Sequence, residues 1–183
     1  VIQAIQLIEL HKNKEEIQKY KIILTALKKS AKWLRKNNDE IVINHDASLV
    51  PFLLILNKIT KDKSYYLYAK EKLFLIQKKI HPEGWFNEYG GADIGYQSFS
   101  IYFLSKSLSY FKNEKYKSLI QNILANAVKF FSYFVHPDKT IGGKYGSRET
   151  NFIIPSGFAS FEYKIKKRIY HEISIGLNLK TLV

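Results

Sequence analysis

Three acidic residues in glycine-rich segments are candidates for acid–base chemistry. Glu88 and Asp93 flank the segment 89–92, and Glu149 follows the segment 145–148. Two carboxylates, one protonated and one ionised, can cleave a glycosidic bond as general acid and general base. Asp93 and Glu149 also lie where helices are expected to begin, so capping of a helix N-terminus is the alternative role for both. Glu88 lies in mid-loop, where no cap is expected, and is the sharper catalytic candidate.

The same two segments carry basic and aromatic side chains that suit a sugar. Arg148 can hold a carboxylate through two parallel hydrogen bonds, and an ion pair with Glu149 is the alternative. Tyr145 is a candidate for moving a proton in a lyase reaction. Lys144 stands where Glu88 stands in the first segment, at a position expected to be exposed. The aromatic residues can either stack on sugar rings or cover the core; they are Trp85, Phe86, Tyr89, Tyr96, Tyr145 and Phe152.

The two segments are copies of one loop. His-Pro-Glu at 81–83 recurs as His-Pro-Asp at 136–138, and Tyr-Gly at 89–90 recurs at 145–146. Each unit is therefore a pair of helices followed by a loop, which is typical of stacked helical hairpins. His81 and His136 are interpreted as residues at helix C-termini that complement the helix dipole, since their spacing matches no zinc motif.

Apolar residues at helical spacing predict five helices that would hold these loops. They are expected over residues 15–36, from 46 or 48 to 59, 63–80, 93–111 and 114–135. Asp46 or Ser48 is expected to cap the second helix, with Pro51 in its first turn, and Asp46 is a third acid at an inner-helix start. The fourth helix is apolar nearly all round, so Phe99 and Phe103 are predicted to be fully buried.

The lengths of the links predict which end of the array carries the site. The links at 61–62 and 112–113 are minimal, whereas those at 37–45, 81–92 and 136–155 are long. Successive links alternate between the two ends of an antiparallel array, so all the long loops fall at one end. Sites are usually built from long loops on a rigid scaffold.

Composition limits the class of protein. The chain has 183 residues, 46% hydrophobic, which suits one domain and excludes a disordered chain. No apolar run reaches the roughly 18 residues that a membrane span needs. With no Cys, disulfides and thiolate sites are excluded. No signal-peptide pattern is visible, which slightly favours a cytoplasmic location.

The net charge of +13 raises the hypothesis of a polyanionic partner. The basic residues are 26 Lys and 3 Arg, whereas phosphate and guanine recognition favours Arg. Nucleic-acid binding through surface Lys is therefore the weaker hypothesis, and an acidic poly- or oligosaccharide is preferred.

Helix pairs with glycine-rich loops at one end resemble the α/α-toroid superfamily, which includes terpenoid cyclases and glycan-processing enzymes. The segment 83–98 is similar to loops of heparinase-type lyase and glycosidase toroids. The resemblance covers about residues 14–160 and lacks the Asp-rich motif of the cyclases. It implies an all-α fold of antiparallel helical hairpins. Because a closed toroid needs about twice this much chain, it also implies half a ring, a fragment or one half of a homodimer.

A single domain over residues 1–183 is predicted, with helical hairpins over about 14–160. Ile173, Ile175, Leu177 and Leu179 alternate with polar residues, so the tail 162–183 is predicted to contain a short strand.

The preferred function is a polysaccharide lyase or glycoside hydrolase that needs no cofactor or metal. A non-catalytic helical scaffold that binds a glycan or a protein is the alternative. The predicted catalytic residues are Glu88, Asp93, Tyr145 and Glu149, and the predicted substrate-binding residues are Trp85, Tyr89, Tyr96, Lys144 and Arg148.

Overall fold

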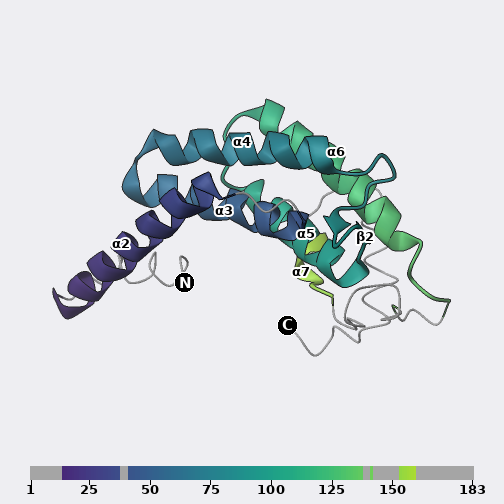
Figure 1. The fold of residues 1–183 in the computed structure, drawn as a ribbon, viewed down its shortest axis with the longest axis horizontal. Helices are drawn as coiled ribbons and strands as arrows, with labels where there is room; N and C mark the ends of the chain where they lie inside the picture. The colour runs from purple at the N-terminus through teal and green to yellow at the C-terminus, as the bar shows by residue number, and fades with distance from the viewer. Residues whose placement is uncertain (1–13, 38–40, 138–140, 142–152, 160–183) are drawn as a thin grey trace.

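The computed structural model describes residues 14–37, 41–137, 141 and 153–159 (Figure 1). Within them it contains six helices and one two-stranded antiparallel sheet, which confirms an all-α fold with a short β element. The sheet lies at residues 87–92, and the strand predicted in the tail 162–183 lies outside the described residues. The elements are α2 Lys14–Lys36, α3 Ile43–Thr60, α4 Lys63–Lys79, β1 Asn87–Glu88, β2 Gly91–Ala92, α5 Ile94–Ser107, α6 Glu114–Ser132 and α7 Ser156–Ala159.

The helices form two layers. The central helices α3 and α5 pack against each other, α4 covers α3, and α6 covers α5 (Figure 1). The short helix α7 returns to α5, where Gly157 C=O accepts a hydrogen bond of 2.9 Å from Ser105 Oγ. Helix α2 leads away from this assembly and rests on it through Leu24, Leu27 and Leu34. The buried apolar residues come from all four of the helices α3–α6, and α3 contributes more of them than any other helix.

The link between α3 and α4 is short, as its sequence predicts. Lys61 ends α3 in the left-handed conformation, with φ of 60°, and its N–H donates to Asn57 C=O. Asp62 then begins α4, because its carboxylate accepts a hydrogen bond of 2.9 Å from Ser64 N–H. Asn113 begins α6 in the same way by accepting from Lys115 N–H.

The expected start of α3 is wrong. The helix begins at Ile43, so Asp46 and Ser48 lie inside it and Pro51 follows in its interior instead of its first turn. The residue before the helix is Val42, whose side chain makes no capping hydrogen bond. A local cap is unnecessary because a distant carboxylate, described below, accepts from the N-terminal turn of α3.

The predicted complete burial of Phe99 and Phe103 is also wrong, because both side chains are only half-buried. The fully buried apolar residues of α5 are Ile101 and Leu104, and small polar residues such as Ser98 complete its packed surface. The helix thus has two apolar sides. The side with Ile101 and Leu104 is buried, and the side with Phe99 and Phe103 is only half-buried. Its two phenylalanine rings form a partly exposed row, with their centroids 6.3 Å apart.

The long link between α4 and α5 lies beside the C-terminal part of α6. Gln97 Nε2 donates to the carbonyls of Gly84 and Ala127, at 3.0 and 3.2 Å, and so joins link, α5 and α6. The expectation that loops 81–92 and 136–155 lie side by side stays a prediction, since most of the second loop lies outside the described residues.

Candidate active site at the N-terminal ends of α3 and α5

The β1–β2 hairpin places Glu88 against the start of α3. Glu88 pairs with Gly91 across the hairpin and also forms an isolated antiparallel bridge with Val42. The turn needs two positive backbone φ angles, 56° at Tyr89 and 90° at Gly90. The hairpin thus fixes the side chain of Glu88 inward, and only 3% of this residue is exposed. Its expected exposure, inferred from its mid-loop position, is wrong.

The Glu88 carboxylate accepts two hydrogen bonds from a single residue. Asn44 N–H donates to Oε1 at 2.9 Å, and Asn44 Nδ2 donates to Oε2 at 2.6 Å. Asn44 is the second residue of α3, so its N–H is one of the donors that a helix leaves without an intrahelical partner. Glu88 therefore acts as the cap of α3 from across the fold.

Burial dominates the acidity of Glu88. Burial raises its pKa from 4.5 to about 7, although the two hydrogen bonds from Asn44 act in the opposite direction. The negative charge of Asp93 raises the pKa further, and His45 lowers it. Glu88 is consequently a carboxyl group that exchanges its proton near neutral pH, beside a second carboxylate.

Asp93 begins α5. Its Oδ1 accepts a hydrogen bond of 2.9 Å from Tyr96 N–H, and the residue is 1% exposed. The capping role considered for Asp93 is thus confirmed, and its catalytic role stays a prediction. Since Glu88 caps α3 and Asp93 caps α5, the N-termini of the two central helices bring two carboxylates close enough to interact.

The predicted aromatic residues separate into three environments. Tyr89 is 53% exposed and meets the half-buried Tyr96 edge to face, with ring centroids 6.3 Å apart, beside the carboxylates. Trp85 stacks on His81 with 4.2 Å between the centroids, and so belongs to the end of α4. Phe86 is completely buried and belongs to the core. Among the predicted aromatic residues that the structure describes, Tyr89 and Tyr96 therefore offer a partly exposed aromatic surface next to Glu88 and Asp93.

The third acid, Asp46, is held in an ion pair. Lys72 Nζ lies 2.6 Å from Asp46 Oδ1, and both side chains are buried, at 2% and 1% exposure. Lys79 Nζ lies 3.9 Å from the other carboxylate oxygen. Asp46 thus joins α3 to α4.

The remaining predicted site residues lie outside the described residues; they are Lys144, Tyr145, Arg148 and Glu149, together with the aromatic Phe152. Among the residues that the structure does describe, no group of three or more His, Cys, Asp or Glu could hold a metal ion. No described helix is long and apolar enough to cross a membrane.

Two residues of the site were not recognised from the sequence, because both fall in the predicted polar link 37–45. Asn44 orients Glu88, and His45 lowers its pKa. The signal that could have found them is the polar run Asn44-His45-Asp46 directly before a long apolar segment, at the start of a central helix.

The comparisons with known proteins bear on the fold. No protein-family model matches the chain, and no curated protein matches its sequence. A solved structure, a glycosyl hydrolase of family 88 from Bacteroides vulgatus, matches 96% of this chain with a TM-score of 0.62 and 12% identity. The chain covers 57% of the length of that structure. The match supports a distant resemblance to the α/α toroid, so the helical hairpins define the class of fold.

Proposed function

We propose that this chain is a glycan-processing α/α-toroid domain with a glycoside hydrolase-like site at Glu88 and Asp93. The observation that carries the proposal is the buried Glu88 carboxyl group, with a pKa of about 7, beside the carboxylate of Asp93. A carboxyl group with a raised pKa beside a second carboxyl group is a common arrangement for the acid and base of glycoside cleavage.

The chemistry assigned to Glu88 is that of a general acid. At neutral pH a part of the Glu88 population carries the proton that a glycosidic oxygen must receive as its bond breaks. After the transfer, the two N–H groups of Asn44 stabilise the carboxylate that remains. The exposed ring of Tyr89 supplies a flat face on which a sugar can stack.

The finer parts of the proposal rest on the sequence. Lys144 and Arg148 would hold the carboxylate of an acidic sugar, Glu149 would add a further carboxylate, and Tyr145 would move the proton if the reaction is a lyase elimination. An acidic glycan also suits the net charge of +13. The choice between hydrolase and lyase, the heparinase-type resemblance and a homodimer belong to this proposal.

A non-catalytic scaffold is the second candidate, and one observation favours it. Glu88 is 3% exposed and already caps α3, which is a sufficient structural reason for an acid at this position. In that case the same end of the molecule would bind a glycan or a protein without cleaving it.

The decisive experiment measures cleavage of uronate-containing oligosaccharides by the full chain and by Glu88→Gln. We expect the variant to lose about 10²–10⁴-fold in turnover while circular dichroism shows the same helix content. Glu83→Gln is the matched control, because that side chain is 70% exposed and should leave turnover within about twofold. Full activity of Glu88→Gln would exclude its role as the acid. If the unmodified chain and Glu88→Gln both bind the oligosaccharide and neither cleaves it, the scaffold is favoured.

A further inference from the structure

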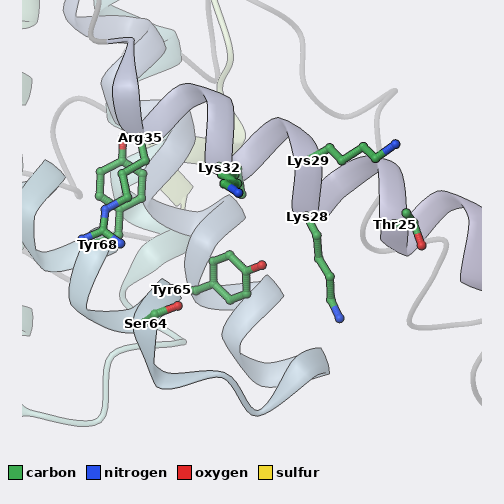
Figure 2. Close-up of a pocket in the computed structure, with 9 residues that line it drawn as sticks. Thr25, Lys28, Lys29, Lys32, Arg35, Ser64, Tyr65 and Tyr68 are labelled. Carbon is green, nitrogen blue, oxygen red and sulfur yellow. The ribbon is translucent and has the colours of Figure 1, made fainter.

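A concave site lies between α2 and α4, away from the carboxylate site (Figure 2). It is a cleft of about 360 Å³, within the range of small-molecule sites. Its walls come from the middle of α2 and from the first residues of α4. The lining residues are Thr25, Lys28, Lys29, Ala31, Lys32, Arg35, Ser64, Tyr65 and Tyr68.

The cleft is remote from Glu88 along the helices. Ser64 and Tyr65 stand at the start of α4, whereas the hairpin that carries Glu88 follows the end of that helix. Helix α4 has 17 residues, so the two sites lie toward opposite ends of it. The cleft is therefore not a part of the carboxylate site.

The cations of the cleft form one stripe on α2. Lys28, Lys32 and Arg35 follow each other at spacings of four and three, which places them on one flank of the helix. The apolar residues that rest on the core, such as Leu27 and Leu34, form the adjacent flank. Figure 2 shows Lys28 extending from α2 toward the turn before α4, on the side where Tyr65 lies.

Within the described residues, this stripe carries an excess of positive charge. All four charged residues that line the cleft are cations, and like charges at these spacings destabilise a helix. Within the described residues, no carboxylate lies within ion-pair distance of Lys28, Lys32 or Arg35. The nearby acid Asp62 offsets Lys28 in part: the hydrogen bonds from Ser64 lower the pKa of Asp62 most, and the charge of Lys28 lowers it further. An anionic ligand would therefore gain from the cations and would also relieve their repulsion.

The facing wall is aromatic and hydroxylated. Tyr68 is fixed, because its hydroxyl donates to Leu34 C=O at 2.7 Å and its ring lies 5.6 Å from the Arg35 guanidinium carbon. Tyr65 is half-buried and Ser64 is exposed beside it. A flat ring with hydroxyl groups around it matches the alternating apolar faces and hydroxyl groups of a sugar.

We propose that the cleft between α2 and α4 binds an anionic oligosaccharide, with its acidic groups on Lys28, Lys32 and Arg35 and a sugar ring on Tyr65. The anionic character of the ligand follows from the cleft, and the choice of a glycan rests on the proposed function. Nucleic acid is the competing polyanion, and the experiment below includes it as an outcome. The cleft thus anchors an acidic chain away from the carboxylate site.

The test compares two triple variants of the full chain with equal loss of charge. The first is Lys28→Gln/Lys32→Gln/Arg35→Gln. The matched control is Lys112→Gln/Lys115→Gln/Lys129→Gln, three exposed cations elsewhere on the surface. Binding of tetragalacturonate is measured by calorimetry. We expect affinity to fall at least about tenfold in the first triple and less than about twofold in the control.

Further measurements distinguish a failure of this proposal from a failure of the proposed function. Glu88→Gln should bind tetragalacturonate as the unmodified chain does, so loss of turnover and loss of binding are distinguishable. If both triple variants lose the same affinity for tetragalacturonate, the binding depends on net charge and not on the cleft, and the proposal is overturned. Equally tight binding of a neutral oligosaccharide of the same length would overturn it too. Tighter binding of single-stranded oligodeoxythymidine, lost in the first triple alone, would assign the cleft to nucleic acid instead.

Discussion

Glu88 and Asn44 stand 44 residues apart in the sequence, and the Glu88 carboxylate accepts both the backbone N–H and the side-chain N–H of Asn44. The contact ties the β1–β2 hairpin to the first turn of α3. It also makes the protonation state of one buried acid part of the stability of a central helix. Capping and acid chemistry at Glu88 therefore depend on the same proton.

The first prediction concerns pH. The folded chain binds the Glu88 proton more tightly than the unfolded chain, since the pKa is about 7 instead of 4.5. The resulting contribution to stability is complete below about pH 4.5 and is lost as the pH rises through about 7. Its size is at most about 3.5 kcal/mol, because the pKa rises by about 2.5 at about 1.4 kcal/mol for each pKa unit. Urea unfolding at about pH 5 and about pH 8 measures the loss directly.

Glu88→Gln supplies the comparison, because glutamine is neutral at both pH values. We expect the variant to lose less unfolding free energy between the two pH values than the unmodified chain does. Glu83→Gln should keep the full pH dependence, as that side chain is 70% exposed. Parallel pH profiles for the unmodified chain and Glu88→Gln would contradict the raised pKa.

Much of the site could be predicted from the loop itself. The hairpin segment and the position of Asp93 before a long apolar helix identified two carboxylates at one end of the molecule. The burial of Glu88 could not be inferred, because it depends on the Val42 bridge and on Asn44, which the chain brings in from another link. Local sequence gives no information on which distant donor a loop carboxylate will reach.

The second prediction concerns Gly84, which lies where the α4–α5 link touches α6. Its φ is 97°, and a Cβ there would lie 2.4 Å from the backbone oxygen of Asn126. Gly84→Ala therefore combines backbone strain with a clash that a side-chain rotation cannot relieve. We expect a loss of about 3 kcal/mol or more in unfolding free energy.

Gly90→Ala is the control for Gly84→Ala. Gly90 has a similar φ of 90°, but a Cβ there would meet nothing within 4 Å. We expect it to cost only about 1 kcal/mol, from the strain alone. Chemical denaturation of both variants tests this difference, and equal losses would mean that the link does not press on α6.

The five longer helices α2–α6 were predictable from periodicity, whereas the short helix α7 was not predicted. The starts and the packed faces of the central helices were also harder to predict. Helix α3 starts at Ile43, because Glu88 provides a remote cap that no local residue announces. In α5 the apolar residues surround the axis, so periodicity could not tell the packed side, with Ile101 and Leu104, from the half-buried row of Phe99 and Phe103. Contacts between helices and loops decide both where α3 starts and which side of α5 is packed.

The third prediction concerns the buried ion pair of Asp46 and Lys72. Lys72→Met introduces an apolar side chain of similar length and removes the charge that lies 2.6 Å from Asp46 Oδ1. Asp46 would then stay buried, and among the described residues its remaining ion-pair partner would be Lys79, 3.9 Å from its other oxygen. We expect a loss of about 3–5 kcal/mol in unfolding free energy, because an uncompensated charge remains in the interior.

The double variant Asp46→Leu/Lys72→Met separates the lost charge partner from lost packing. It removes both charges and leaves apolar groups in the space between α3 and α4, so its stability should return to within about 2 kcal/mol of the unmodified chain. Urea unfolding of the two single variants and the double variant gives the coupling energy of the pair. If Lys72→Met costs less than about 1 kcal/mol, water or Lys79 compensates Asp46, and the pair does not join the two helices. If the double variant is as unstable as Lys72→Met, the effect comes from packing and not from the unpaired carboxylate.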